Sequence, residues 1–290
     1  MQRLTSRIDK SVNWITPYGR GKIETRFVFK ERKGGYPIAY VSSHSGCRMG
    51  CKFCFLTRQN QTSFDHVDRD GYISQMETVL NHWKTLNMSA SKINVNFMAR
   101  GEPLANKHVI NNWTYIGCAL TSLAFGYNLH PKFNISTILP YTMKDRELTD
   151  VLFNYRPHVY YSMYSTSDEF RSRWLPNALP LHIALPKLRR YEMESIDAGV
   201  VKPVVFHWAL IKGQNDSIEE AYKIADMIKM HKFVGKFNLV QYNPFDDASE
   251  ESPHNEKIFK IISQTFGESE SYIVPRVGKD VAASCGMFID

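Results

Sequence analysis

The stretch SSHSGCRMGCKFCF at residues 42–55 holds three of the five cysteines of the chain within eight residues: Cys47, Cys51 and Cys54. An odd number of cysteines argues against a secreted disulfide framework. The first residues, MQRLTSRIDK, lack the apolar run of a secretory signal, and the most apolar stretches, such as VVFHWAL, are too short to span a bilayer. We therefore expect reduced thiols in a cytoplasmic protein that does not bind a membrane.

The sequence around this stretch alternates between two kinds of segment. Short runs rich in β-branched and aromatic residues predict strands at 37–43, 92–98, 132–138, 158–163, 202–210 and 236–241. Helical spacing of apolar residues predicts helices at 71–88, 106–124, 143–154, 181–198, 217–232 and 254–266. Six strand–helix units predict an α/β fold with a parallel sheet, either doubly wound or curled into a full or partial barrel. A last strand at 271–275 precedes a tail of small residues.

Unusual side chains follow these strands at their carboxyl ends. Cys47 follows the first predicted strand, Gly101 and Glu102 follow the second, and Asn243 follows the sixth. Other polar residues end the third and fourth strands, namely Ser136, Ser162 and Tyr164. Because the carboxyl ends of parallel strands meet on one face of the sheet, we expect these residues to share one site.

Three neighbouring thiols indicate a metal site, since thiolates bind zinc and iron–sulfur clusters. Structural zinc takes four protein ligands, so His44 or His66 would have to add the fourth. Cys118 lies within a predicted helix, where we expect a plain buried thiol. A [4Fe–4S] cluster on three cysteines leaves one iron open to an outside ligand.

The spacing Cys-x3-Cys-x2-Cys after the first strand, with Phe53 before the last cysteine, resembles the radical S-adenosylmethionine (SAM) superfamily. The resemblance implies a partial (β/α)6 barrel with a short N-terminal basic extension and a C-terminal cysteine-bearing tail. It implies that Cys47, Cys51 and Cys54 hold a [4Fe–4S] cluster whose open iron chelates SAM. One electron then cleaves SAM to methionine and a 5′-deoxyadenosyl radical.

Further segments are similar to the RNA adenine C2-methyltransferases, which modify ribosomal and transfer RNA and have relatives that methylate C8. These segments are IET (23–25), VSSHSGC (41–47), GEPL (101–104), ISTI (135–138), NDS (215–217), YNPF (242–245) and VGKDVAASCG (277–286). The resemblance implies that Gly101 and Glu102 meet the amino group of SAM. It gives the other contacts with SAM to Ser136, Ser162, Met163, Tyr164 and Asn243.

The same resemblance gives Cys285 and Glu24 catalytic roles. A first SAM methylates the C-terminal cysteine, here Cys285, and a radical from a second SAM removes hydrogen from that methyl group. The resulting carbon radical adds to the adenine ring, forming a protein–RNA adduct. Glu24 matches a carboxylate that acts as a base or contacts the adenine; the alternative is a glutamate on the surface of a strand.

Two features depart from the family pattern. Tyr40 occupies the position of a second free cysteine that helps to resolve the adduct, which leaves Glu24, Tyr40 or water for that step. Tyr164 replaces a usual histidine. Family members also carry a helical accessory domain before the barrel, whereas this chain has about 35 residues there.

Those first residues, 1–35, carry nine basic and three acidic side chains, which is +6 of the net charge of +7. Interleaved aromatic residues, Trp14, Tyr18, Phe27 and Phe29, suit an arm that binds RNA phosphates and stacks on bases. The alternative is a strand pair whose aromatic residues pack onto the body. The predicted division is a basic N-terminal extension (1–35), a radical SAM partial barrel (36–270) and a C-terminal strand with the cysteine tail (271–290).

The sequence therefore predicts a monomeric RNA methyltransferase that uses a [4Fe–4S] cluster and two SAM molecules per turnover. Its expected partners are ribosomal or transfer RNA and a reducing protein such as flavodoxin or ferredoxin. Two rivals stay open: a radical SAM enzyme that acts on a small molecule or peptide, and a non-catalytic RNA-binding module stabilised by a metal.

Overall fold

The computed structural model describes residues 1–31, 34–245, 249–267 and 270–289, and it contains one ten-stranded sheet whose strands follow chain order. The strands are β1 (Gln2–Thr5), β2 (Val12–Tyr18), β3 (Gly21–Lys30), β4 (Tyr36–Tyr40), β5 (Lys92–Phe97), β6 (His130–Thr137), β7 (His158–Tyr161), β8 (Val204–Ala209), β9 (Lys236–Val240) and β10 (Tyr272–Val274). The helices are α1 (Phe55–Arg58), α2 (Arg69–Thr85), α3 (Lys107–Phe125), α4 (Leu148–Val151), α5 (Asp168–Trp174), α6 (Leu181–Asp197), α7 (Ile218–Met230) and α8 (Asn255–Ser263).

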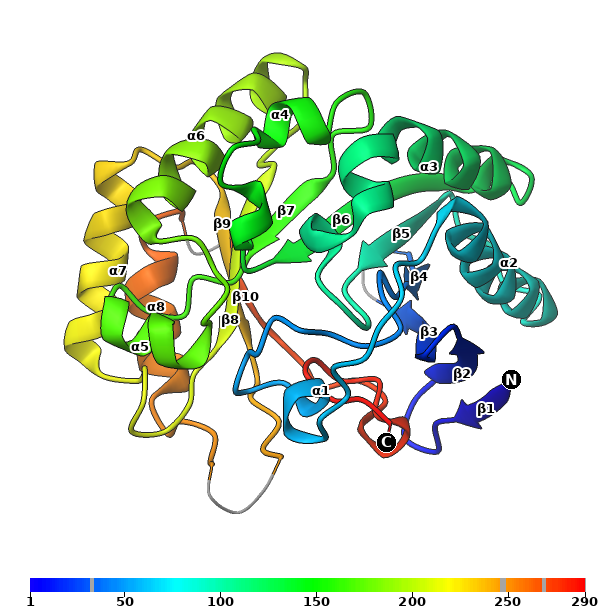
Figure 1. Cartoon of the computed structure of the whole chain (residues 1–290), viewed down its shortest axis with the longest axis horizontal. Helices are drawn as coiled ribbons and strands as arrows, with labels where there is room; N and C mark the ends of the chain where they lie inside the picture. The colour runs from blue at the N-terminus through cyan, green and yellow to red at the C-terminus, as the bar shows by residue number, and fades with distance from the viewer. Residues whose placement is uncertain (32–33, 246–248, 268–269, 290) are drawn as a thin grey trace.

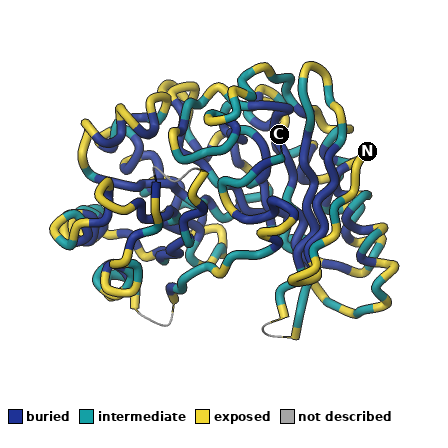
Figure 2. The backbone as a smooth tube through the Cα atoms, turned by 90° about the horizontal axis from the view of Figure 1, so that it is seen from below, coloured by how far each residue is buried: buried dark blue, intermediate teal, exposed yellow. Residues whose placement is uncertain are grey.

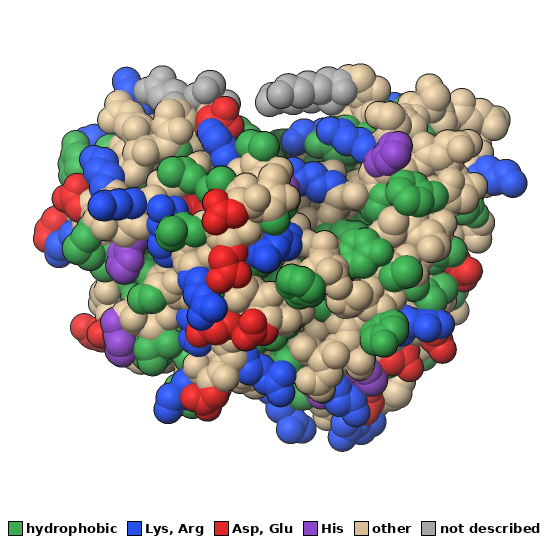
Figure 3. All heavy atoms as spheres, turned by 90° about the horizontal axis from the view of Figure 1, so that it is seen from above, with side chains coloured by type: hydrophobic (Ala, Val, Ile, Leu, Met, Phe, Trp, Pro, Cys, Tyr) green, Lys and Arg blue, Asp and Glu red, His purple; other side chains and the backbone are tan. Residues whose placement is uncertain are grey.

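The strands from β4 to β10 are parallel, and they curve into an open barrel with helices outside it (Figure 1). β1 and β10 form the two edges of the sheet. The predicted α/β partial barrel is confirmed, including its last strand. Coloured by burial, the strands are mostly buried and the surrounding helices expose their outer faces (Figure 2). Seen from above, acidic and basic side chains lie side by side on part of the surface (Figure 3). Among such pairs, Lys187 Nζ lies 3.0 Å from a Glu147 carboxylate oxygen.

Residues 1–31 do not form a free arm, because β2 and β3 pair antiparallel and β3 pairs antiparallel with β4. Phe27 is fully buried, and its ring lies 4.8 Å from His82 of α2. Trp14 is buried as well and also meets His82, at 5.4 Å. These two rings are therefore core residues, as in the alternative of a packed strand pair, and they are not exposed for stacking on bases.

Part of the basic charge of this segment is neutralised inside the protein. Arg20 pairs with Asp65 at 3.0 Å, and Lys10 pairs with Glu31 at 3.3 Å. Arg26 is buried beside Glu24. Arg32 and Lys33, which also contribute to the charge, lie outside the described residues.

Three helices differ from the prediction, and one of them, the short α1, was not expected from the sequence. α4 has four residues in place of the expected 143–154, preceded by a 3-10 turn at Tyr141–Met143. Asn154, at φ +65°, takes the left-handed conformation that ends such a segment. α5 was not predicted, although Ser167 caps it by accepting a hydrogen bond from the Phe170 N–H at 3.2 Å. The signal was the sequence SDEF, a cap followed by acidic residues.

None of the helices in the described part of the chain combines the length and apolarity needed to cross a membrane.

Substitution of Phe206 on β8 tests how much the packing of the barrel core contributes to the free energy of unfolding. Its side chain is fully buried, and its ring lies 5.0 Å from that of Phe233 and 5.7 Å from that of Phe266. We expect Phe206→Ala to lower the free energy of unfolding by about 3–5 kcal/mol, measured by urea titration. Tyr222→Ala, on the exposed face of α7, should stay within about 0.5 kcal/mol of the parent. Equal losses in both variants would contradict the assignment of the core.

Candidate active site

One cavity lies where the parallel strands end. It is lined by nine residues that the sequence singled out: Cys47, Cys51, Cys54, Gly101, Glu102, Ser136, Ser162, Tyr164 and Cys285. Further lining residues include Phe53, Met98, Thr137, His207 and Phe288. The carboxyl ends of the strands, the loop after β4 and the C-terminal tail thus meet at a single site.

The cysteine loop is fixed by its own backbone. The Cys47 N–H donates to the Gln61 carbonyl at 3.0 Å, and the Cys54 N–H donates to the Cys51 carbonyl at 3.0 Å. Gly46 is required for close approach, since a Cβ there would lie 2.2 Å from the Ser63 carbonyl oxygen. The loop therefore holds its three thiols in place before any ligand binds.

Burial dominates the chemistry of the three thiols. Burial, reinforced by the neighbouring thiols, raises the pKa of Cys47 to about 12 and that of Cys51 well above its usual value. Burial also raises the pKa of Cys54 to about 11, although N–H groups of Leu56 and Thr57 hydrogen-bond to its sulfur. Buried thiols with such pKa values ionise readily only when a cation replaces the proton. The donor set therefore suits a bound metal group, and the N–H bonds to sulfur are a feature of iron–sulfur sites.

Within the described residues, no three His, Cys, Asp or Glu side chains converge to hold one metal ion. A [4Fe–4S] cluster makes no such demand, because each thiolate binds a different iron. The two histidines considered as extra zinc ligands bond to each other, with His44 Nε2 lying 3.0 Å from His66 Nδ1. Burial, followed by the charge of His66, lowers the pKa of His44 to about 3, so it is neutral at pH 7.

Gly101 and Glu102 form one wall of the cavity. Gly101 has φ +92°, and a Cβ there would lie 2.5 Å from Nδ1 of His44. The buried Glu102 carboxylate accepts from the Leu104 N–H and the Ile138 N–H, each at 3.1 Å. Burial raises the pKa of Glu102 to about 7. A cationic amino group in the cavity would favour the ionised carboxylate.

The remaining predicted SAM contacts divide into two groups. Ser136, Ser162 and Tyr164 line the cavity, and the Tyr164 ring stacks on Phe53 at 4.4 Å with an interplanar angle of 16°. Met163 is fully buried and is not among the residues that line the cavity, so its contact with SAM stays a prediction.

Cys285 enters the cavity from the C-terminal tail. Cys285 is exposed as a residue and lines the cavity. Burial of its thiol raises the pKa of Cys285, and the charge of Arg26 opposes that rise. Asn243 is not a lining residue and instead donates from Nδ2 to the Cys285 carbonyl at 2.9 Å. The Phe55 N–H donates to the Gly286 carbonyl at 3.1 Å, which ties the tail to α1.

A buried group of charges, which we call the Glu24 cluster, anchors this tail; its members are Asn13, Glu24, Arg26 and Arg100. Glu24 Oε2 accepts from Asn13 and Arg26, each at 2.8 Å, and Glu24 Oε1 accepts from Arg100 Nε at 3.0 Å. The side chains of Glu24 and Arg100 are 0% exposed, and that of Arg26 is 2% exposed.

The Glu24 cluster binds the tail mainly through backbone groups. The Ile289 N–H donates to Glu24 Oε1 at 2.9 Å, and Arg100 donates to the Ile289 carbonyl at 2.5 Å. Arg26 donates to the Met287 carbonyl at 2.6 Å, and Asn13 donates to the Val281 carbonyl at 3.0 Å. Cys285 therefore lies between points of attachment on both sides.

Glu24 is neither a surface glutamate nor a free base in this conformation. Burial by itself raises the pKa of its carboxyl, but Arg26, Arg100 and the hydrogen bond from Asn13 together lower it below the ordinary value of 4.5. A base needs a free lone pair directed at its substrate, and both carboxylate oxygens are engaged here. The expectation of an exposed residue is wrong, because Glu24 and Arg26 share the inward face of β3.

Tyr40, which replaces the second cysteine of the family, lies close to Cys285. Burial raises the pKa of Tyr40 to about 12, with a further contribution from the Cys285 thiol and an opposing hydrogen bond to Asn96. Tyr40 therefore keeps its proton at pH 7 and acts as a hydrogen-bond donor.

Cys118 was expected to be buried, and this is wrong. It lies on the exposed side of α3, while Ile116 and Gly117 face the barrel. Helical periodicity predicts the helix but not which small residue faces outward.

Sequence reasoning missed Arg26, Arg100 and His207. Arg26 stands two residues after Glu24 on one strand face, and Arg100 precedes Gly101, so both were adjacent to chosen residues. His207 lines the cavity, and burial lowers its pKa to about 4. Its only signal was a polar residue within the apolar run VVFHWAL.

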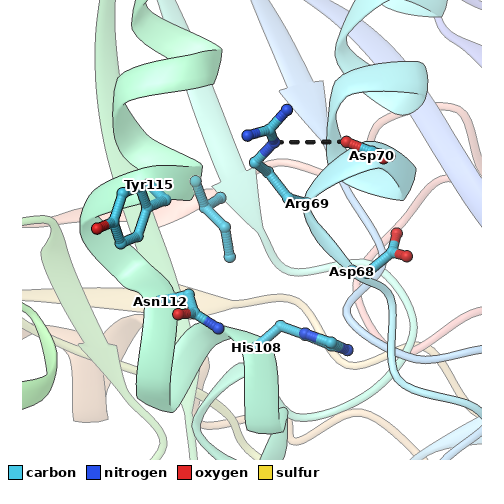
Figure 4. Close-up of a pocket in the computed structure, with 7 residues that line it drawn as sticks. Asp68, Arg69, Asp70, His108, Asn112 and Tyr115 are labelled. Carbon is cyan, nitrogen blue, oxygen red and sulfur yellow. Dashed lines mark ion pairs between the residues drawn. The ribbon is translucent and has the colours of Figure 1, made fainter.

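A second pocket lies on the outer side of the barrel between α2 and α3 (Figure 4). Its lining residues are Asp68, Arg69, Asp70, His108, Asn112, Tyr115 and Ile116. Arg69 and Asp70 form an ion pair at 3.4 Å along its rim. None of the predicted site residues lines this pocket.

Comparison with known proteins finds RNA methyltransferases that are similar to this chain over nearly its whole length. It is 27% identical over 285 residues to the dual-specificity RNA methyltransferase RlmN of Ruthia magnifica subsp. Calyptogena magnifica, which covers 96% of this chain and 74% of the relative. It is 29% identical over 296 residues to a probable dual-specificity RNA methyltransferase RlmN of Clostridium botulinum (strain Loch Maree / Type A3). That alignment covers 99% of this chain and 78% of the relative. No family model matches the chain.

Among solved structures, a radical SAM methyltransferase from Sphaerobacter thermophilus superposes with a TM-score of 0.77 at 20% identity. The superposition covers 99% of this chain and 80% of the other. The chain thus shares the fold of a radical SAM methyltransferase, and its three thiols follow β4 at the carboxyl ends of the parallel strands. Its homologues by sequence are dual-specificity RNA methyltransferases, the family that the sequence resembles.

The Glu24 cluster predicts how stability depends on pH. The folded-state pKa of Glu24 lies below the unfolded value of 4.5. Its contribution to stability is therefore fully present above the unfolded value and is lost as pH falls through the lower, folded-state pKa. At pH 7 we expect Glu24→Gln to lower the free energy of unfolding by about 3–5 kcal/mol, since two buried arginines lose their counter-charge. The loss should shrink below pH 4, measured by urea titration at each pH.

Glu77→Gln, on the exposed face of α2, is the matched control and should leave the pH profile unchanged. A Glu24→Gln variant as stable as the parent at pH 7 would contradict the assigned role of the cluster.

Proposed function

We propose that this chain methylates an adenine ring carbon, C2, in ribosomal or transfer RNA through a methyl group carried on Cys285. The proposal is supported above all by one observation: Cys285 and the three cysteines of the loop line the same cavity. The names of its relatives, which are RNA methyltransferases, support RNA as the substrate.

Cys47, Cys51 and Cys54 would hold the [4Fe–4S] cluster, and Glu102 would accept from the amino group of SAM. When bound, the cluster and SAM supply a methyl group and a carbon-centred radical. Ser136 and Ser162 offer hydroxyl groups to the bound SAM, and the stacked pair of Phe53 and Tyr164 gives the cavity an apolar wall.

Cys285 would give up its thiol proton and carry the methyl group as a thioether. Loss of one hydrogen atom from that methyl group leaves a carbon radical that can form a bond to adenine C2, a carbon that is not nucleophilic. Because the Glu24 cluster and Asn243 hold the tail on both sides of Cys285, the methyl group would meet the adenine in a restricted position. An adenine within folded RNA must leave its stack to reach the cavity.

Resolution of the adduct is left to Tyr40 or water, since both oxygens of Glu24 are engaged. A reducing protein, a monomeric state and the division into 1–35, 36–270 and 271–290 stay predictions.

The Cys285→Ala variant tests the proposed methyl carrier, because it removes that thiol and leaves the three cluster ligands in place. The protein is reconstituted anaerobically with iron and sulfide and mixed with SAM, a reductant and RNA. We expect the variant to bind iron as the parent does but to leave digested RNA without methyladenosine, while the parent carries a methyl group on Cys285 by mass spectrometry. Cys118→Ala, on the outside of α3, is the matched control and should retain full activity. Full RNA methylation by Cys285→Ala would contradict the proposal.

Cys51→Ala tests the cluster independently. Because the variant lacks one of three cluster ligands, we expect nearly all of its molecules to lose the iron–sulfur absorbance near about 400 nm. The variant should also form no 5′-deoxyadenosine. Formation of 5′-deoxyadenosine by the parent without any modification of Cys285 would favour an enzyme acting on a small molecule or peptide. Its complete absence in a loaded parent would favour a non-catalytic metal-stabilised module.

A further inference from the structure

Five basic side chains gather at the end of the barrel opposite the thiols, and we call them the basic ring: Lys30, Lys92, Lys132, His158 and Lys236. Three of them are the first residues of the parallel strands β5, β7 and β9, and Lys132 lies near the start of β6. Lys30 ends the antiparallel strand β3, which brings it to the same end. β5 alone spans about 17 Å, so the ring is remote from Cys285.

The side chains of the ring are close enough to repel one another. Burial, then the charges of Lys236, Lys92 and Lys30, lower the pKa of Lys132 to about 8. Burial, then the charge of Lys132, lowers the pKa of His158 to about 4. Like charges gathered in a partly buried place destabilise a protein unless an anion joins them.

The described residues provide no such anion, because no ring lysine forms an ion pair with a carboxylate among them. Two glutamates lie next to strands of the ring, and each pairs with another lysine. Glu31 pairs with Lys10 at 3.3 Å, and Glu270 pairs with Lys202 at 3.0 Å.

Two tyrosines position the ring. Nζ of Lys92 lies 4.4 Å from the centre of the Tyr36 ring, and Nζ of Lys30 lies 4.8 Å from that of Tyr272. These contacts hold two ammonium groups at the mouth of the barrel.

The barrel interior next to the ring contains polar atoms without partners. The Oδ1 atoms of Asn94, Asn134 and Asn238 are buried and accept no hydrogen bond from any described group. Asn94 is the register partner of Lys132, and Asn134 is that of His158, so these amides adjoin the ring. Asn134 and Asn238 are each 1% exposed. A buried acceptor normally has a donor, and a bound group with an O–H or N–H would supply one here.

The ammonium groups of the basic ring and the amide oxygens of the asparagines together suit a single kind of ligand. Ammonium groups require an anion with several oxygen acceptors, and the amide oxygens require a donor. Monohydrogen phosphate has both, because it keeps one O–H group at pH 7. Sulfate offers the acceptors but no donor.

We propose that the basic ring and the adjoining asparagine amides bind a small phosphate-bearing anion inside the amino-terminal mouth of the barrel. This site is separate from the cavity that contains Cys285 and does not rest on the proposed methyl transfer. The alternative is a set of lysines whose ammonium groups are solvated by water while their stems fill the mouth.

Thermal unfolding of the full chain with its cluster reconstituted tests the proposal, using inorganic phosphate, sulfate or chloride at equal ionic strength and pH 7. Matching the ionic strength removes general screening of the lysines. At phosphate about tenfold above its Kd, we expect the midpoint of unfolding to rise by about 2–4 °C, with sulfate giving a smaller rise and chloride none. An equal rise in phosphate and sulfate, or no rise in either, would overturn the proposal.

The double variant Lys132→Gln/Lys236→Gln should lose the rise caused by phosphate. Lys257→Gln, on the exposed face of α8, is the matched control and should keep it. Retention of the full rise in the double variant would count against the ring.

Equilibrium dialysis of the unaltered chain against radiolabelled phosphate gives an answer even if the double variant fails to fold. One bound phosphate per chain supports the site, and none overturns it. A twelve-nucleotide RNA is added in a further arm. If it displaces the phosphate, the ring is an RNA contact and the assignment to a small anion is wrong; unchanged binding supports that assignment.

Discussion

The Glu24 cluster is the interaction on which the arrangement of the active site depends. Two arginines and one glutamate removed from water are costly unless every charge is paired and every donor and acceptor is used. The cluster meets part of this requirement through the backbone of the C-terminal tail: its arginines donate to two tail carbonyls, and Glu24 accepts from one tail N–H. The stabilisation is therefore mutual. Backbone groups of the tail hydrogen-bond to the buried charges, and these bonds hold the segment that carries Cys285 beside the cavity.

The parallel sheet brings the other half of the site to the same place. β4 to β9 all end at one face of the sheet. The thiol loop after β4 and the Gly101–Glu102 turn after β5 therefore meet there, although they are distant in the sequence. The three N-terminal strands extend this sheet and supply Glu24 and Arg26. A segment whose composition suggested a nucleic-acid arm thus mainly extends the sheet of the barrel.

Local patterns predicted much of this architecture. The spacing of Cys47, Cys51 and Cys54 and the alternation of strands and helices were sufficient for the fold class and for the cavity that gathers their side chains. The sequence did not reveal the partners of Glu24, because Arg100 and Ile289 lie 76 and 265 residues away. The exposure of Cys118 escaped prediction, and the burial of Trp14 was only one of two alternatives, since each depends on which face of its element meets the body.

The attachment of the tail to β3 has a consequence for the order in which the protein matures. During synthesis, Ile289 leaves the ribosome 265 residues after Glu24, so the carboxylate and its arginines remain hydrated while the barrel assembles. Joining segments so distant in sequence is slow compared with forming neighbouring strands and helices. The nascent chain can therefore complete most of its barrel first, and the tail with Cys285 is the last segment to take its place beside the cavity.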